Sequence, residues 1–213
     1  MQSIAVLDYG MSNLRSVAKA LEFVCAGRCR VLVTDRAEEL LGAERVVFPG
    51  QGAIGQCMTN LRRLGLIEAV SSCVRSKPYL GICLGLQSLM ESSEENGGTP
   101  CLGLVPGGVV HFPADPRDRA GERCKIPHMG WNHVIRRQAH ALWRDIEPDA
   151  RFYFVHSYFV APRRSEDVAA VTEHALEFVS AVARENVFAV QFHPEKSQRA
   201  GLQLLRNFVA WRP

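Results

Sequence analysis

One cysteine in this sequence, Cys83, has neighbours that could turn its thiol into a nucleophile. It lies in Gly81-Ile82-Cys83-Leu84-Gly85, with a glycine two residues away on either side. The apolar run Tyr79–Ile82 predicts a short buried strand, and Leu84–Met90 predicts a helix. A strand that turns sharply into a helix at Gly-x-Cys-x-Gly is the cysteine form of a nucleophile elbow. Side chains at the two glycines would collide with backbone in such a strained turn.

The predicted elbow would also activate the thiol. A helix N-terminus carries partial positive charge, so it favours thiolate at Cys83. The backbone N–H of Leu84 would stay free to donate to an oxyanion that develops beside the sulfur. A structural cysteine in a glycine-rich turn is the alternative, which this window alone leaves open.

A cysteine nucleophile needs a base and a group that orients this base. Among the seven histidines, His193 stands out because it follows the apolar strand predicted over residues 187–192. Glu195 comes two residues later, and an extended chain through Pro194 would put both side chains on one side. The carboxylate could then hold one imidazole nitrogen while the other faces Cys83, as in a catalytic triad. Without the elbow, a surface His-Pro-Glu turn would be the preferred interpretation.

A second oxyanion donor must come from elsewhere in the sheet. The third predicted strand, residues 45–48, is broken by Pro49-Gly50-Gln51-Gly52. In a parallel sheet this turn lies at the same edge as the elbow, where chemistry gathers. Backbone amides near Gln51 or Gly52, framed by Gly50, are therefore candidate oxyanion donors. An ordinary glycine-rich turn after a strand is the alternative.

These groups need a scaffold that brings three distant segments together. Up to residue 83, short apolar strands alternate with helical patterns, which predicts a parallel sheet with helices on both faces. Beyond a polar loop at residues 91–100, short apolar pieces between turns predict several further strands. The fold class is therefore α/β: an open, mostly parallel, flavodoxin-like sheet flanked by helices on both faces, with additional mixed or antiparallel strands in the C-terminal half. No linker or repeat divides the chain, so we expect one domain over residues 1–213.

Composition excludes several function classes. The residues are 47% hydrophobic and 22% charged, as in soluble globular proteins. The net charge of +3 without a basic run argues against a nucleic-acid partner, and no apolar stretch is long enough to span a membrane. The N-terminus has no secretory signal pattern, so we expect a cytoplasmic protein. Seven scattered cysteines fit reduced thiols, and the spacing of cysteine and histidine residues gives no metal site.

Taken in order, the elbow, the Pro-Gly turn and the His-Pro-Glu segment resemble the motifs of class I, triad-type glutamine amidotransferases. The resemblance implies an enzyme that needs no cofactor. It would form a γ-glutamyl thioester from L-glutamine, release ammonia and then hydrolyse the thioester. It also implies roles for the matching residues: Cys83 as nucleophile, His193 as general base and acid, Glu195 as orienting carboxylate, and Gln87, Ser157 and Tyr158 as glutamine contacts.

Four further segments narrow the resemblance: residues 8–17, 127–132, 153–158 and 191–198. They are similar to the family members that supply ammonia to a (βα)8-barrel cyclase subunit in histidine biosynthesis. This implies a heterodimer with such a cyclase, in which Asn13, Tyr153 and Lys196 match positions facing the cyclase and the ammonia entrance. A paralogue that feeds ammonia to a surface-sugar amidation system is the main alternative.

Two positions depart from the family pattern. Ser12 stands where glycine is usual, and Gln51 stands where a small apolar residue is common. In the family, the loop at residues 49–52 is thought to need a peptide flip when the cyclase binds its ligand. We therefore expect low glutaminase activity that rises with the cyclase and its nucleotide. A catalytically silent scaffold, a cysteine hydrolase of peptides or esters, and a nucleotide-binding flavodoxin-like module are further alternatives.

Overall fold

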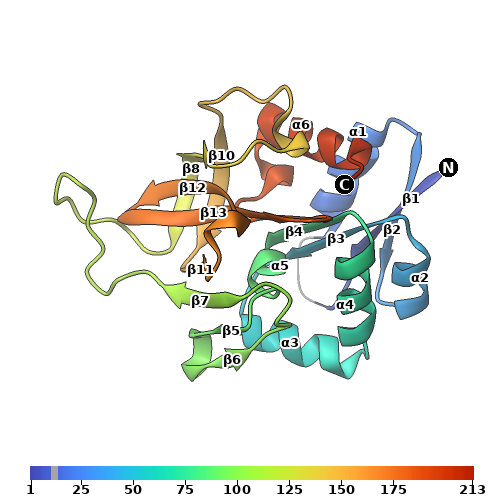
Figure 1. Cartoon of the computed structure of the whole chain (residues 1–213), viewed down its shortest axis with the longest axis horizontal. Helices are drawn as coiled ribbons and strands as arrows, with labels where there is room; N and C mark the ends of the chain where they lie inside the picture. The colour runs from blue at the N-terminus through green and yellow to red at the C-terminus, as the bar shows by residue number, and fades with distance from the viewer. Residues whose placement is uncertain (11–13) are drawn as a thin grey trace.

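The computed structural model describes residues 1–10 and 14–213. Its centre is a large sheet with strand order β2-β1-β3-β4-β14-β13-β11-β7-β5-β6, and helices cover both faces of the half that contains β1–β4 (Figure 1). This half consists of β1 (Gln2–Leu7), α1 (Leu14–Cys25), β2 (Cys29–Thr34), α2 (Ala37–Gly42), β3 (Arg45–Gly50), α3 (Ile54–Arg63), α4 (Ile67–Ser76), β4 (Tyr79–Cys83), α5 (Leu84–Gln87), β14 (Val187–Val190), η4 (Pro194–Lys196) and α6 (Gln198–Ala210). Its strands are parallel, as the alternation of strand and helix patterns predicts.

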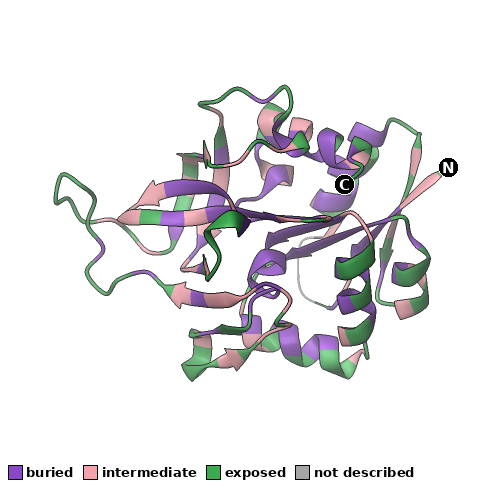
Figure 2. Cartoon of the chain, in the orientation of Figure 1, coloured by how far each residue is buried: buried purple, intermediate pink, exposed green. Residues whose placement is uncertain are grey.

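Successive side chains of β1 point to opposite faces, and both faces are buried. Ile4 and Val6 belong to a core shared with α1 and α6. Ala5 and Leu7 belong to a second core shared with α2, α3 and α4. Figure 2 shows β3 and β4 buried throughout, and β1 buried beyond its first two residues. This double burial is why these strands read as continuous apolar runs rather than as alternating patterns.

The rest of the chain extends the sheet beyond β14 with mostly antiparallel pairs; β5 with β7 is a parallel one. It contains β5 (Ser92–Ser93), η1 (Glu95–Gly97), β6 (Thr99–Pro100), β7 (Gly107–His111), β8 (His128–His133), β9 (Ile135–Arg136), η2 (Ala141–Trp143), β10 (Arg151–His156), β11 (Tyr158–Pro162), η3 (Ser165–Asp167), β12 (Val168–His174) and β13 (Leu176–Arg184). β14 pairs in parallel with β4 and antiparallel with β13, so the sheet changes direction there. β10 and β8 form a separate antiparallel pair. The predicted mixed fold class is confirmed.

Three local predictions are wrong. The helix after the elbow ends at Gln87 rather than Met90, because the carbonyls of residues 88–90 accept hydrogen bonds from backbone amides of residues 102–105 instead of continuing the helix. The polar loop at residues 91–100 contains the short strands β5 and β6. Strand β8 was not predicted, since its alternation of polar and apolar residues is irregular.

The hydrophilic loop at residues 113–125 is mostly exposed and projects beyond the sheet (Figure 1). All seven cysteines carry free thiols. Within residues 1–10 and 14–213, we find no helix whose length and apolar character would let it cross a bilayer.

Candidate active site

The elbow at Cys83 is a strained turn between β4 and α5. Cys83 has φ 53° and ψ −106°, a backbone conformation that residues other than glycine rarely adopt. Its side chain is buried, with 5% of the residue exposed. As the first residue of α5, Leu84 has a backbone N–H without an acceptor in its own helix. The turn therefore presents a sulfur and a free donor together.

The two glycines around the elbow leave room for neighbouring backbone. A Cβ at Gly85 would lie 1.8 Å from the carbonyl oxygen of Phe48 on β3. A Cβ at Gly81 would lie 2.9 Å from the carbonyl oxygen of Gly85. The collision expected from the sequence is thus present at both positions, and it is more severe at Gly85 because the contact there is shorter.

The Pro-Gly turn lies directly beside the elbow. Gly50 is the register partner of Cys83 across β3 and β4. A Cβ at Gly50 would be 2.3 Å from Tyr9 Oη and 2.7 Å from Leu84 Cβ, so only glycine fits. Gly52 has φ 96°, and Gln51 is exposed. The loop predicted to supply oxyanion donors is therefore next to the sulfur.

His193 and Glu195 contact each other as predicted, by a different local geometry. His193 Nδ1 lies 2.9 Å from Glu195 Oε1, and both side chains are only 4% exposed. The chain between them does not run extended: Pro194–Lys196 forms the 3₁₀ turn η4. The fixed φ of Pro194 suits the first position of this turn, and the turn brings Glu195 back to the imidazole of His193. The predicted contact is therefore present, but a 3₁₀ turn makes it and an extended chain does not.

The charge state of His193 depends on its neighbours. Burial alone lowers the pKa of His193, but a Cys83 thiolate together with the Glu195 carboxylate outweighs burial and raises this pKa to about 10. The other ring nitrogen, Nε2, is buried and has no hydrogen-bond partner within the described chain. When Cys83 is a thiolate, His193 therefore holds a proton at neutral pH.

Ser197 and Gly201, which the sequence did not single out, hold the His193 segment in place. Ser197 Oγ donates to the carbonyl of His193 at 2.6 Å and accepts from the backbone N–H of Tyr153 at 2.9 Å. A Cβ at Gly201 would lie 1.9 Å from the carbonyl oxygen of Pro194, so α6 packs tightly against η4. Two sequence signals were available for these residues: Ser197 comes three residues after Pro194, and Gly201 lies in the helix that follows.

Gln191 was also missed as a site residue, although it adjoins Cys83. Gln191 Nε2 lies 3.5 Å from Cys83 Sγ, and Gln191 Oε1 accepts from Gln87 Nε2 at 3.1 Å. Gln87 Nε2 also donates to the carbonyl of Tyr158 at 3.0 Å. The sequence does carry a signal, since Gln191 is the one polar residue in the apolar run 187–192.

A pocket of about 660 Å³ opens in front of Cys83. Its lining includes every predicted glutamine contact and most of the predicted oxyanion loop: Gln51, Gly52, Cys83, Leu84, Gln87, Ser157 and Tyr158. Glu95, which was not predicted, is the one carboxylate among the described residues of this lining. Glu95 Oε2 also accepts from the backbone N–H of Ile54 at the start of α3, at 2.9 Å. The pocket is large enough for an amino acid.

One wall of the pocket is supported by two buried histidines. His156 Nδ1 donates to the carbonyl of Tyr158 at 2.8 Å, so its Nε2 accepts from His128 Nδ1 at 2.9 Å. His128 Nε2 then accepts from Asn132 Nδ2 at 3.2 Å. Burial, with smaller contributions from neighbouring histidines, lowers the pKa of both His128 and His156 to about 3. Both are neutral at pH 7, which fixes the hydrogen bonds of this wall.

Of the residues predicted to face a partner, the structure describes two. Lys196 Nζ lies 5.9 Å from the centre of the Tyr153 ring, within cation–π range. Asn13 and the family departure at Ser12 lie outside the described residues. On β8, paired with β10, Met129 and Trp131 are 64% and 41% exposed. The described residues contain no cluster of histidine, cysteine and carboxylate side chains suited to a metal ion.

Comparison with known proteins agrees with this arrangement. The profile of the family described as glutamine amidotransferase class-I matches residues 5–211. The chain is 55% identical over 211 residues to the imidazole glycerol phosphate synthase subunit HisH of Nitrosococcus oceani, covering 99% of this chain and 98% of that protein. It is also 55% identical over 214 residues to the HisH subunit of Aromatoleum aromaticum, covering 100% of both.

Solved structures agree at the level of the fold. The chain superimposes on a glutamine amidotransferase crystal structure with a TM-score of 0.72 and 18% identity, covering 97% of each chain. A glutamine amidotransferase from Thermotoga maritima gives a TM-score of 0.64 at 14% identity, covering 93% of this chain and 78% of that one. From its matched family profile and its full-length relatives, this chain belongs to the class I glutamine amidotransferases.

Proposed function

We propose that the chain is the glutaminase subunit of an imidazole glycerol phosphate synthase in histidine biosynthesis. The observation that carries this proposal is the strained Cys83 turn beside His193, whose Nδ1 lies 2.9 Å from Glu195 Oε1. Similarity over the full length to proteins named as HisH subunits supports this synthase rather than a surface-sugar amidation system. The three residues Cys83, His193 and Glu195 would form the catalytic triad.

In the first half of the reaction, the Cys83 sulfur attacks the side-chain amide carbon of glutamine. A C–S bond forms, and the carbonyl electrons move onto oxygen. This oxyanion would accept hydrogen bonds from the Leu84 N–H and from an amide of the turn Gly50–Gly52. His193 gives its proton to the leaving nitrogen, the C–N bond breaks, and ammonia departs from a γ-glutamyl thioester.

In the second half, His193 is neutral and acts as a base. It takes a proton from water, whose oxygen attacks the thioester carbonyl. Collapse of the tetrahedral intermediate breaks the C–S bond and releases glutamate, which restores the Cys83 sulfur and the His193 proton. Glu195 stabilises the imidazolium each time it forms and keeps the ring oriented.

Glutamine would be held by the other residues of the pocket. Because Gln87 Nε2 already donates within the protein, Gln87 Oε1 is left to accept from the substrate. Ser157 and Tyr158 line the same space. The Glu95 carboxylate would attract the α-ammonium group of glutamine, the one cationic group of that substrate.

The partner would be a (βα)8-barrel cyclase subunit that receives the ammonia. Large exposed apolar side chains at Met129 and Trp131, next to Tyr153 and Lys196, are typical of an interaction surface. Asn13 joins this proposal on family resemblance alone. A cytoplasmic location and a single domain over residues 1–213 remain predictions.

The decisive experiment measures glutamate from glutamine with the chain alone, with a barrel cyclase, and with the cyclase plus its nucleotide ligand. We expect low activity that rises in the full mixture. Cys83→Ser should abolish glutamate formation, while the assembled enzyme still uses ammonium salts. Loss of both activities would point to a structural role for Cys83. Turnover of an ester without release of ammonia from glutamine would instead favour a cysteine hydrolase.

A further inference from the structure

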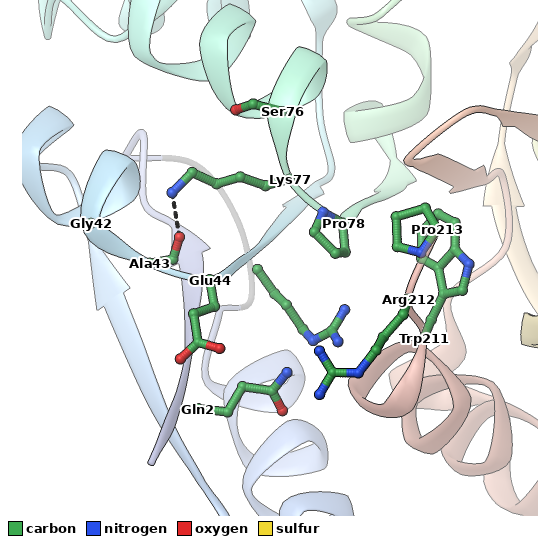
Figure 3. A pocket seen from close by; sticks show the side chains of 11 residues that line it. Gln2, Gly42, Ala43, Glu44, Ser76, Lys77, Pro78, Trp211, Arg212 and Pro213 are labelled. Carbon is green, nitrogen blue, oxygen red and sulfur yellow. Dashed lines mark hydrogen bonds between the residues drawn. The ribbon is translucent and has the colours of Figure 1, made fainter.

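A second cavity lies at the edge of the sheet opposite to Cys83. It has a volume of about 490 Å³ and opens between the start of β3 and the C-terminal residues (Figure 3). Arg45 begins β3 and Gly50 ends it, so about 16 Å of strand separates the two sites. The residues that matter for its chemistry are Gln2, Glu44, Arg45, Lys77 and Arg212. None of them takes part in the proposed glutaminase reaction.

Arg45 is a buried cation with an unused donor. Only 3% of the residue is exposed. With its amide oxygen facing Arg45, Gln2 accepts from Arg45 Nε and from Nη2, the latter at 3.1 Å. Nη1 is buried and has no acceptor among residues 1–10 and 14–213. Leaving a charged donor buried without a partner is costly, so this nitrogen marks the place for an acceptor from outside the chain.

A second guanidinium faces the same space. In Figure 3 the Arg212 side chain points into the cavity toward Gln2. Burial lowers the pKa of Arg45, and the positive charge of Arg212 lowers it further, while Glu44 acts in the opposite direction. Neither arginine forms a salt bridge with a carboxylate of the described chain. The cavity therefore contains two close positive charges without a bound counter-ion from the protein.

Two other charged side chains, Lys77 and Glu44, line the cavity, and both have partners. Lys77 Nζ donates to the carbonyl of Leu41 at 2.6 Å and to that of Ala43 (Figure 3), so its ammonium neutralises the end of α2. The exposed Glu44 carboxylate accepts from the backbone N–H of Ser3 at 3.3 Å. Among the described side chains of the cavity, the positive charges that neither a backbone carbonyl nor a carboxylate binds are thus those of the two arginines.

We propose that this cavity binds a small oxyanion, a phosphate or carboxylate group, between Arg45 Nη1 and Arg212. The planar guanidinium fork matches the oxygens of such groups. A bound oxyanion would satisfy the buried nitrogen and offset the repulsion between the two arginines at once. The shared chemistry admits a free ion or the anionic group of a metabolite.

Thermal unfolding of the full-length chain in phosphate, acetate or chloride at equal ionic strength tests this proposal. If the phosphate Kd is about 1 mM, about 10 mM phosphate should raise Tm by about 3–6 °C over chloride. A larger rise in acetate than in phosphate would identify the group as a carboxylate. Phosphate is also excluded from protein surfaces and stabilises folds in general, so variants must decide.

Arg212→Gln should lose the rise in Tm that phosphate gives over chloride, because it removes one of the two guanidinium groups. Arg212 is exposed, so the substitution leaves the core intact. Arg45→Gln should lose it as well. Arg75→Gln is the matched control, since Arg75 is exposed on α4 outside the cavity, and it should keep the full rise. An equal rise in wild type and Arg212→Gln would overturn the proposal, even if Arg45→Gln does not fold. Because these variants leave Cys83 untouched, glutaminase activity would stay unchanged, which separates this test from that of the proposed function.

Discussion

The side-chain nitrogen of Gln191 lies 3.5 Å from the sulfur of Cys83. The same amide accepts from Gln87, which lines the pocket. The nucleophile on β4 is therefore connected through one glutamine after β14 to the predicted substrate contact on α5. Neither Gln191 nor Cys83 is free to rotate without breaking this connection.

Gln191→Met should lower the kcat for glutamine about 10-fold with little change in KM. The substitution keeps the volume but removes the donor that orients the sulfur, and lost orientation acts on the reacting geometry. Steady-state glutaminase kinetics with the activating partner would measure this. Gln203→Met on α6 is the control, and an unchanged kcat in Gln191→Met would refute the positioning role.

Glu195→Gln should move the alkaline limb of the kcat/KM profile to lower pH. The negative charge of Glu195 helps raise the pKa of His193 to about 10, so its removal lowers that pKa and shortens the range in which His193 carries a proton. We expect kcat to fall about 10–100-fold, against more than about 1000-fold for His193→Ala. An unshifted limb with a lowered kcat would mean that Glu195 acts by orientation alone.

Gly85→Ala should destabilise the protein by about 3 kcal/mol or more, because its new methyl group would meet the Phe48 carbonyl of a central strand. Gly42→Ala is the matched control: nothing lies within 4 Å of its Cβ position, and alanine favours the end of α2. Denaturant unfolding of both variants measures the difference. Similar stabilities would contradict the close packing of the elbow against β3.

Stability should fall as pH drops below about 6.5. The folded-state pKa of His128 and of His156 is about 3, below the unfolded value near 6.5, so between these values the unfolded chain binds more protons than the folded one. Each histidine then lowers the free energy of unfolding by up to about 1.4 kcal/mol for each pH unit below 6.5. Above pH 6.5 neither histidine changes the stability with pH. Denaturant unfolding at pH 7 and pH 5 checks this, and His128→Phe should show a shallower slope. A flat dependence would show that these rings are accessible to protons.

Trp131→Ala should weaken binding to a barrel cyclase about 10–100-fold. Trp131 is 41% exposed and its ring centre is 6.1 Å from that of Tyr153, so it would lose contact area with the partner rather than core packing. Calorimetry or fluorescence titration measures the Kd. Leu41→Ala, which removes a 45% exposed apolar side chain from α2, serves as control. Equal affinity for both variants would locate the partner elsewhere.

The elements around Cys83 could be predicted because local pattern and buried environment agree there. β1–β4 are apolar on both faces, and glycine spacing marks the elbow. The length of α5 could not be predicted, since backbone amides of residues 102–105 bind the carbonyls of residues 88–90, which a longer helix would have used. Such competition between distant segments leaves no periodic signal in the sequence.

Among the site residues, those in compact motifs were predictable, while those defined by distant contacts were not. His193 and Glu195 are two residues apart, so their contact could be inferred. Gln191 contacts the Cys83 sulfur from the segment after β14, and Glu95 lines the pocket from the turn η1. Only the folded sheet brings these side chains beside the sulfur.

β14 is the strand at which the parallel and antiparallel halves meet, and the chain leaving it carries both the amide that contacts the sulfur and the imidazole that would serve it. The proposed reaction at Cys83 thus depends on how the antiparallel half packs against β14. The backbone N–H of Gln191 donates to the carbonyl of Ser180 on β13, and that of His193 donates to the carbonyl of Tyr153 on β10. Partial detachment of the antiparallel half would therefore release Gln191 and His193 from their positions beside the sulfur, even while the helices stayed packed on β1–β4.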